Sequence, residues 1–233
     1  MNLSSNPIDK RWSMKFRAIA FDIDGTLYPN YRMYLYSLIP ALKHPILALN
    51  FGRVRKDIRK VRPVENFRHL QARMLADYMG CSAEHAFALA ERFLYDRWVT
   101  SFRGLKPFPG VRAVLDSFNH AGFKLAAMSD FPIQSKLDYL GLSGLWDTAF
   151  TAEDTHYLKP HPEPFLRLIE ELECRPEEIL YVGNSYSYDI EGACAVGIHT
   201  AHLTKRPVPG SKADFSFFHY SDLRDFVFSH SGV

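Results

Sequence analysis

After Gly104, the sequence alternates between short apolar runs and longer amphipathic segments. The apolar runs predict strands at 123–128, 148–151, 179–182 and 200–203, and the segments around them predict helices at 111–121, 133–140, 162–173 and 189–196. An aromatic run that begins at Phe215 predicts a last strand. Strands that alternate with helices form βαβ units, which place their strands side by side in a parallel sheet. The alternation therefore restricts this part of the chain to an α/β fold.

A first strand is predicted at residues 15–24, and it ends in two acids. The apolar run Ala18–Phe21 continues directly into Asp22-Ile23-Asp24-Gly25-Thr26. Two carboxylates this close together disfavour each other's ionisation, so the pair needs a nearby cation. Gly25 and Thr26 turn the chain sharply and leave backbone N–H groups free to face an anion. The five residues therefore predict a functional site at the end of this strand.

Further polar residues lie just past the carboxyl ends of later strands. In open α/β sheets, ligands bind outside that edge. If the first strand joins the same sheet, its two acids lie at this edge as well. We therefore expect one site that gathers all of these side chains. The later residues are Ser129 and Asp130, Lys159 in a loop, and Asn184 with Asp189.

Residues 28–103 predict a small all-helical unit. Apolar residues recur at helical spacing at Val54, Ile58 and Val61, and again between Asn66 and Met79. Gly80 is expected to end the second of these helices, and Ser82 to cap the next one. We therefore expect a core made of residues 1–27 and 104–233, with residues 28–103 as a helical domain inserted into it.

Composition and charge exclude several classes of protein. The 233 residues are 47% hydrophobic, which is enough for a sizeable core and a smaller domain, and the net charge of +2 does not favour nucleic acid as a partner. The three cysteines show no pairing pattern, which favours a reducing compartment. The first apolar run is too short for a signal peptide, and the longer stretch at 34–51 is interrupted by Pro and charged residues. We expect a cytoplasmic protein without stable membrane association.

A basic run, residues 53–62, surrounds the first apolar stripe of the helical unit. The simplest interpretation is an amphipathic helix with a solvated basic face. Two alternatives are that one of the cations reaches a second anionic group of a substrate, or that the face binds anionic lipid or another acidic partner. The sequence leaves the role of this run open, and it does not distinguish a monomer from a homodimer.

Four motifs, taken in chain order, resemble those of the haloacid dehalogenase superfamily. They are the Asp-Ile-Asp-Gly-Thr segment at 22–26, Ser129 after a strand, Lys159-Pro160, and Gly183-Asn184-Ser185 with Asp189. The resemblance extends from about residue 16 to about residue 203, and residues 28–103 lie where many members carry a cap. It implies a Rossmann-like core, in which helices cover both faces of the parallel sheet, plus a small all-helical cap. It also implies phosphoryl transfer through an aspartyl-phosphate.

The resemblance gives each motif residue an expected role. Asp22 is expected to be the nucleophile that attacks phosphorus. Asp24 is expected to protonate the leaving oxygen and later to help activate water, and its pKa should be raised by Asp22 and by the anionic phosphate. Lys159 would neutralise charge on Asp22 and on the transferring phosphoryl group. The phosphate-binding residues would be Ser129, Lys159, Gly25 and Thr26.

A magnesium ion is implied at the same edge of the sheet. Its ligands would be the carboxylate of Asp22, the backbone carbonyl of Asp24, and side chains at positions 184 and 189. Magnesium prefers oxygen ligands, few carboxylates and several waters. The family usually has Asp where this chain has Asn184, so one negative charge is missing. Whether Asn184 or Asp189 is the direct ligand is left open.

The expected activity is a magnesium-dependent phosphatase for a small phosphorylated metabolite, such as a sugar phosphate, phosphoglycolate or a nucleoside monophosphate. A phosphomutase would share every core motif and is the alternative. A non-catalytic binding module is a third possibility, which only Asn184 supports. Dehalogenation attacks carbon and needs no second carboxylate, so Asp24 argues against it. Carbon–phosphorus cleavage through an imine would need a cap lysine in a recognisable sequence context. Residues 28–103 contain Lys43, Lys56 and Lys60, but none of them has such a context.

Overall fold

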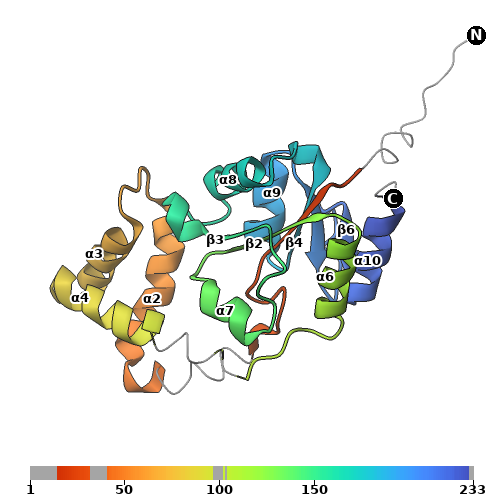
Figure 1. The fold of residues 1–233 in the computed structure, drawn as a ribbon. Helices are drawn as coiled ribbons and strands as arrows, with labels where there is room; N and C mark the ends of the chain where they lie inside the picture. The colour runs from red at the N-terminus through yellow and green to blue at the C-terminus, as the bar shows by residue number, and fades with distance from the viewer. Residues whose placement is uncertain (1–14, 32–40, 97–101, 103, 231–233) are drawn as a thin grey trace, which may run out of the picture.

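The computed structural model describes residues 15–31, 41–96, 102 and 104–230. Its centre is a six-stranded, all-parallel sheet in the order β3-β2-β1-β4-β5-β6 (Figure 1). The α/β class predicted from the sequence is therefore confirmed. The strands are β1 (Ala18–Phe21), β2 (Lys124–Ser129), β3 (Thr148–Thr151), β4 (Ile179–Gly183), β5 (His199–Leu203) and β6 (Phe215–Phe217).

Both faces of the sheet are covered, as the side chains of β1 show. Ile19 and Phe21 belong to one apolar core, whereas Ala18 and Ala20 belong to the core on the opposite face. All four residues are completely buried. A parallel strand that is buried on both faces is apolar throughout, which explains the continuous apolar runs in the sequence.

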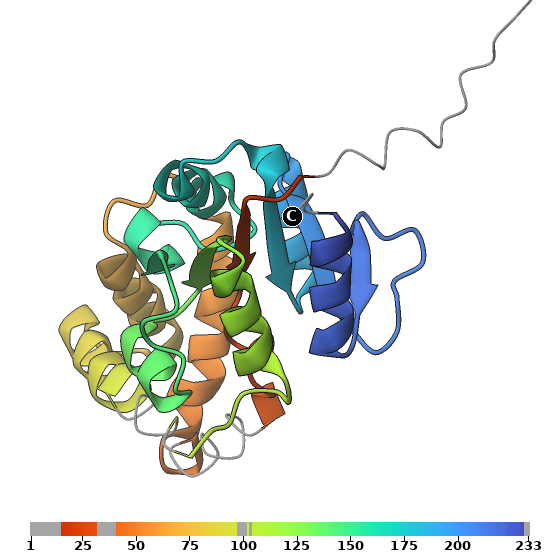
Figure 2. The ribbon, with the colours of Figure 1, turned by 45° about the vertical axis from the view of Figure 1, so that its right-hand side comes forward.

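Helices form a layer on each face of the sheet (Figures 1 and 2). Side chains of α6 (Val111–His120), α7 (Gln134–Tyr139) and α10 (Tyr220–Ser229) pack into the first core. Side chains of α8 (Pro162–Leu172) and α9 (Glu191–Ala195) pack into the second. The expected Rossmann-like arrangement, with helices on both faces, is confirmed.

A group of helices lies between β1 and α6 in the sequence, and we call it the helical insertion. It contains α2 (Pro45–Asp57), the 3₁₀ turn η2 (Ile58–Lys60), α3 (Phe67–Met79), α4 (Ala83–Ala90) and the π-helical turn η3 (Glu91–Asp96). The side chain of Asn66 caps α3, and Gly80 ends it in the left-handed conformation with φ of 65°. Ser82 caps α4, as its position predicted.

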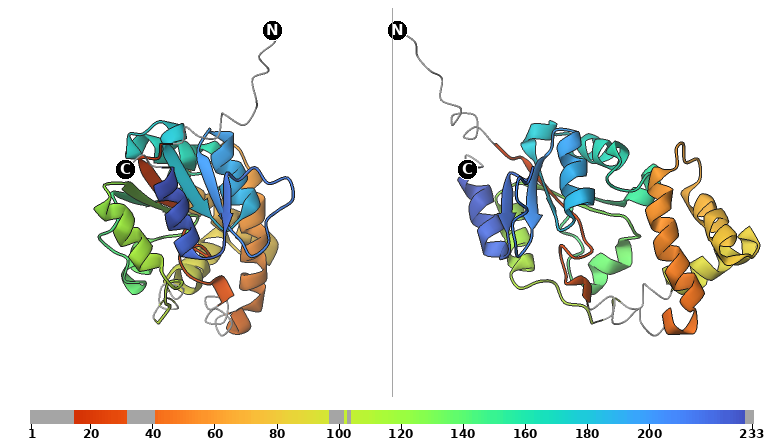
Figure 3. Two further views of the ribbon diagram at one scale, coloured as in Figure 1. Left: turned by 90° about the vertical axis from the view of Figure 1, so that its right-hand side faces the viewer. Right: turned by 180° about the vertical axis from the view of Figure 1, so that it is seen from behind.

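The helical insertion has an apolar core of its own and a second apolar contact with the sheet layer. Its own core includes Leu47, Val54 and Leu75. A separate cluster joins three residues around η2 and the start of α3 to Ala152 and Leu158. Ala152 begins the 3₁₀ turn η4 (Ala152–Thr155), which directly follows β3. The insertion therefore packs at the carboxyl edge of the sheet, and the right-hand view of Figure 3 shows it to one side of the sheet layer.

Two elements differ from the sequence prediction by two residues or more at an end. The first strand covers only residues 18–21 of the predicted 15–24, because pairing with β2 and β4 extends over those four residues. The helix predicted at 189–196 is α9, and a π-helical turn, η6 (Tyr186–Ile190), precedes it. No helix in the described ranges is long and apolar enough to span a bilayer.

Candidate active site

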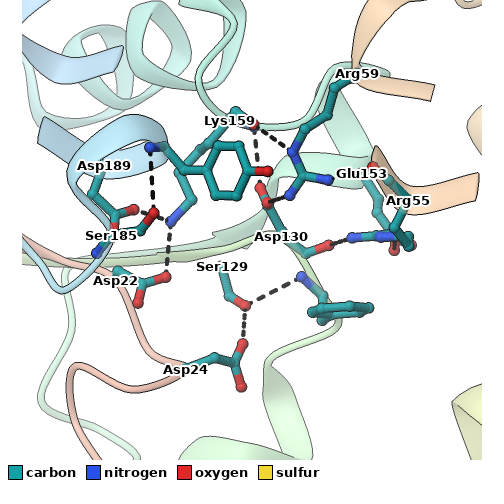
Figure 4. A network of polar contacts seen from close by, with 12 residues as sticks. Asp22, Asp24, Arg55, Arg59, Ser129, Asp130, Glu153, Lys159, Ser185 and Asp189 are labelled. Carbon is teal, nitrogen blue, oxygen red and sulfur yellow. Dashed lines mark hydrogen bonds and ion pairs between the residues drawn. The ribbon is translucent and has the colours of Figure 1, made fainter. Parts of the chain in front are cut away.

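The parallel register of the sheet brings the predicted site residues to one edge. Phe21 lies beside Ala127 of β2 and Val182 of β4, so Asp22 emerges next to the ends of both neighbouring strands. The N–H of Asp22 donates to the carbonyl of Val182 at 2.9 Å. Figure 4 shows Ser129, Lys159 and Asp189 at the edge of the sheet where Asp22 lies, so these residues are brought together.

Asp22 is buried and is held by two donors. Lys159 Nζ lies 2.8 Å from its Oδ1, and the hydroxyl of Thr26 donates to its Oδ2 at 2.8 Å. Burial raises the pKa of Asp22 to about 7, because the ion pair with Lys159 offsets only part of the desolvation and the carboxylates of Asp189 and Asp24 add repulsion. The carboxyl group is therefore sensitive to any further cation placed beside it.

Lys159 connects Asp22 to Asp189. Its Nζ lies 2.6 Å from Asp189 Oδ1 and 3.1 Å from the hydroxyl of Tyr181, and only 3% of the side chain is exposed. Burial alone would lower the pKa of Lys159, but the two carboxylates hold it well above its usual value. The lysine is therefore a fixed positive charge beside Asp22. Tyr181, an inward-facing residue of β4, had no sequence signal that distinguished it from a core tyrosine.

Asp24 differs from its expected state. Its carboxylate accepts hydrogen bonds from Tyr28 at 2.5 Å and Ser129 at 2.6 Å, and it pairs with Lys136 Nζ at 2.5 Å. Burial acts to raise the pKa of Asp24, but the buried cation of Lys136 and these hydrogen bonds hold it below the usual value. The expectation of a raised pKa was therefore wrong for the structure described here, because Lys136 of α7 was not anticipated. Nothing in the sequence marks that lysine as other than a helical surface residue.

Ser129 and Thr26 are in place but already have partners. Ser129 is fully buried; its Oγ donates to Asp24 and accepts from the N–H of Phe131 at 3.1 Å. The hydroxyl of Thr26 donates to Asp22, and its N–H donates to the carbonyl of Ile23 at 3.2 Å. Their expected contacts with a phosphoryl group would therefore require these hydrogen bonds to rearrange.

Asn184 and Asp189 are linked to different oxygens of Asp22, through Thr26 and Lys159 respectively, and have different surroundings. Both carboxylate oxygens of Asp189 are occupied, one by Lys159 and the other by the N–H of Ser185 at 2.9 Å. The Oδ1 of Asn184 accepts only a long hydrogen bond from Thr26, at 3.3 Å. Of the two candidate metal ligands, Asn184 has the freer oxygen.

Gly25 provides space for two amides beside the Asp22 carboxylate. Its φ of 90° favours glycine, and a Cβ atom there would lie 2.3 Å from Asn30 Nδ2 and 2.4 Å from Asn184 Nδ2. The Nδ2 of Asn30 donates to the carbonyl of Asp24 at 3.3 Å, while its Oδ1 is buried without a hydrogen-bond partner among the residues described. Sequence reasoning missed Asn30.

The oxygen atoms that could act as metal ligands near Gly25 suit magnesium better than a softer metal. Within the described part of the chain, no three His, Cys, Asp or Glu side chains are grouped as ligands for a metal. The carboxylate of Asp22 and the amide oxygen of Asn184 both accept from Thr26, and the amide of Asn30 donates to the carbonyl of Asp24. The oxygen of Asn30, which has no partner among the described residues, would gain one from a hydrated cation. This oxygen-only, weakly charged set fits an ion that keeps several waters.

A cleft of about 480 Å³ opens beside this group of donors. Its lining includes Gly25, Asn184, Phe108, Lys205 and Tyr220. The hydroxyl of Tyr220 donates to the carbonyl of Thr26 at 2.5 Å and so joins α10 to the turn after β1. The cleft gives water and small solutes a route to the edge of the sheet next to Asn184.

Two arginines of the helical insertion reach carboxylates beside the site (Figure 4). Arg55 is buried, and its Nη1 lies 2.6 Å from Glu153 Oε1, while Arg59 pairs with Asp130. The guanidinium of Arg55 also lies 4.1 Å from the ring centre of Phe131. The prediction of a solvated basic face is therefore wrong for these two arginines. It holds for the exposed members of the run, which are Arg53, Lys56, Lys60 and Arg62.

Comparison with known proteins agrees with this geometry. A family model for haloacid dehalogenase-like hydrolases matches residues 16–197. Glyceraldehyde 3-phosphate phosphatase from Methanopyrus kandleri is 28% identical, with 90% of this chain and 91% of the relative aligned. Phosphoglycolate phosphatase from Mannheimia succiniciproducens is 26% identical over 91% of this chain and 99% of its own length. The fold is also that of a 2-haloacid dehalogenase from Pseudomonas syringae, which superposes with a TM-score of 0.68 at 21% identity and covers 91% of this chain and 98% of its own.

Proposed function

The chain belongs to the haloacid dehalogenase-like hydrolases, and from that premise we propose that it is a phosphoric monoester hydrolase for a small phosphorylated metabolite. The observation that carries the proposal is the pair formed by Asp22 and Lys159 at 2.8 Å, with a second carboxylate, Asp24, two residues further on. A buried carboxylate with a fixed cation beside it suits attack on an anionic phosphoryl group. The curated relatives named above, which are phosphatases, support the same assignment.

In the proposed reaction, an oxygen of Asp22 attacks phosphorus and the ester P–O bond breaks. The leaving oxygen takes a proton from Asp24, and an aspartyl-phosphate forms. Water then attacks the phosphorus of that intermediate, gives its proton to Asp24, and restores Asp22. Lys159 offsets the charge that develops on the phosphoryl oxygens, and Ser129 donates to one of them.

Asp24 needs a change of environment between the two halves of this reaction. Its ion pair with Lys136 favours the carboxylate form, which is the form that accepts a proton from water. The negative charge of a bound substrate would raise the pKa of Asp24 and favour the protonated form that the first half requires. Lys136 is therefore placed to set the balance between the two forms.

Magnesium fits the donor group around Gly25. We propose Asp22, the carbonyl of Asp24 and Asn184 as its ligands, with Asp189 as the candidate for which the geometry is less favourable. Bound there, the ion would offset phosphoryl charge. Asp189, whose oxygens are engaged by Lys159 and Ser185, would instead keep Lys159 in place.

The helical insertion is proposed to act as a cap, with residues 28–103 as its extent and residues 1–27 and 104–233 as the core. Its contact with η4 and its two inward-facing arginines support this role. A cap in this position would exclude water from the phosphoryl group and contact the leaving group. We further propose a cytoplasmic monomer or homodimer that binds neither nucleic acid nor membranes.

The test is hydrolysis of a panel of phosphorylated compounds with and without magnesium. The panel includes glyceraldehyde 3-phosphate, 2-phosphoglycolate, pyrophosphate, several sugar phosphates and nucleoside monophosphates. We expect phosphate release that chelation abolishes and that Asp22→Asn abolishes, whereas Asp154→Asn, at an exposed position, leaves it unchanged. Isomerisation of a sugar phosphate only after addition of a bisphosphate would identify a phosphomutase instead. No turnover and no magnesium binding would contradict an enzymatic role.

A further inference from the structure

Arg59 of the helical insertion closes a ring of polar contacts around the backbone of Lys159 (Figure 4). The N–H of Lys159 donates to Asp130 Oδ1 at 3.1 Å. The other oxygen of Asp130 accepts from Arg59 Nη2. Arg59 Nε in turn donates to the carbonyl of Lys159 at 2.8 Å. Both backbone polar groups of the lysine are therefore fixed, one directly by Arg59 and the other through Asp130.

The guanidinium of Arg59 is itself held in one orientation. Its Nη1 donates to the carbonyl of Arg55 at 2.5 Å, and its plane faces the ring of Tyr188 at 4.4 Å. Only 14% of the Arg59 side chain and 11% of the Asp130 side chain are exposed. A partly buried ion pair with several hydrogen bonds is more specific in geometry than a surface pair.

This arrangement uses three of the five N–H groups of Arg59, which leaves few for the role that the sequence suggested for one cation of the run. Each of its three nitrogens already donates to a protein acceptor, which are the carbonyls of Arg55 and Lys159 and the carboxylate of Asp130. Only two N–H groups remain for a substrate anion, on a side chain that is 14% exposed. The contacts point instead toward the lysine whose Nζ lies against Asp22.

We propose that Arg59 is a positioning residue for Lys159. By fixing the peptide groups of Lys159 it directs the lysine side chain onto Asp22 and Asp189. Because Arg59 comes from the helical insertion, Lys159 is fully held only while the insertion lies on the core. The kinetic part of this inference rests on the proposed phosphatase function, whereas the placement of Lys159 does not.

The test compares Arg59→Ala and Arg59→Lys with Lys60→Ala. Lys60 is the next residue along the chain and pairs with Asp57 on the surface, so it is a matched control. With p-nitrophenyl phosphate, we expect Arg59→Ala to lower kcat by about 10- to 100-fold while KM changes by less than about threefold, because the loss is one of alignment. Arg59→Lys keeps a positive charge for Asp130 but lacks the planar guanidinium, so its kcat is expected to lie between those of wild type and Arg59→Ala.

A second readout does not depend on activity. Acetic anhydride labelling followed by mass spectrometry measures how accessible Lys159 Nζ is in each variant. We expect labelling of Lys159 at least about tenfold faster in Arg59→Ala than in wild type, and unchanged in Lys60→Ala. Thermal melting of each variant identifies global unfolding, and if Arg59→Ala does not fold, Arg59→Lys carries both measurements.

The outcomes separate the two proposals. Unchanged labelling together with a kcat like that of Lys60→Ala would overturn the role of Arg59, and so would a rise in KM alone. Faster labelling of Lys159 in a protein that hydrolyses no phosphate ester would support the positioning role and contradict the phosphatase. A lower kcat and faster labelling of Lys159 in Arg59→Ala, together with a wild-type Tm in Lys60→Ala, would support both the positioning role and the phosphatase.

Discussion

Glu153 joins several contacts between the helical insertion and the core, and we expect Glu153→Gln to destabilise the protein strongly. Its carboxylate accepts from Arg55 at 2.6 Å, from Arg68 at 3.1 Å and from the hydroxyl of Tyr95 at 3.1 Å. Only 5% of its side chain and 7% of the Arg55 side chain are exposed. The substitution removes the charge and leaves the shape nearly unchanged, so it isolates the electrostatic contribution.

The size of the effect follows from what Arg55 keeps. Breaking a buried ion pair by removing one partner costs about 3–5 kcal/mol, since the other charge is left buried. A glutamine at position 153 still offers one amide oxygen, and Arg55 retains the carbonyl of Asp130 and the ring face of Phe131. We therefore expect a loss of about 2–3 kcal/mol in the free energy of unfolding. For a chain of this length, that is a fall of roughly 4–12 °C in Tm.

Urea denaturation followed by tryptophan fluorescence and far-UV circular dichroism measures this loss, and coincident transitions establish that one free energy applies. Glu91→Gln is the matched control, because Glu91 also pairs with Arg68 but its side chain is 36% exposed. Its loss should not exceed about 1 kcal/mol. If Glu153→Gln were no more destabilising than Glu91→Gln, the buried charge would not support the contact between insertion and core, and the reasoning would be refuted.

Three further predictions concern single side chains. Lys136→Met removes the cation beside Asp24, and we expect kcat for p-nitrophenyl phosphate to fall at least about tenfold; an unchanged kcat would show that the pair has no part in the reaction. Asn184→Asp restores a carboxylate to the candidate metal group, and isothermal titration calorimetry should show magnesium binding at least about tenfold tighter, whereas equal affinity would place the metal elsewhere. Burial acts to raise the pKa of Asp214, but the hydrogen bonds from His199 and from the N–H of Thr200 together outweigh it and hold the pKa below the usual value. The stability that Asp214 contributes is therefore present above its unfolded pKa and is lost as the pH falls through its lowered folded pKa. Asp214→Asn should flatten the acid side of a plot of Tm against pH. An unaltered acid side would contradict this.

The strands could be located from the sequence because both faces of the sheet are covered. Burial on two faces makes β4 a continuous apolar run, which needs no knowledge of its neighbours. The extent of β1 could not be found in the same way, because a strand ends where pairing with its neighbours ends. Residues 22–24 are as close to the apolar run as residues 15–17, yet only pairing with β2 and β4 decides where the strand stops.

In the candidate active site, the residues that the sequence expected to converge, and that the structure brings together, are those whose positions follow from strand ends. Asp22, Ser129 and Lys159 meet because parallel strands end at one edge. Lys136 and Arg59 were not identified, since each lies on a helical segment and its inward orientation depends on tertiary packing. The basic run offered six similar cations, and nothing local distinguishes the two that face the carboxylates of Asp130 and Glu153 from the four that are exposed.

The two acids after β1 needed a compensating cation, and the sequence suggested a metal. In the structure each acid has a lysine of its own, with Lys159 beside Asp22 and Lys136 beside Asp24. The two lysines come from separate elements, so the two carboxyl groups can differ in how readily each is protonated. With that charge already offset, a magnesium site needs few further carboxylates, and Asn184 in place of the usual acid becomes consistent with the rest of the site. The phosphate group of a substrate would then supply much of the negative charge that holds the metal.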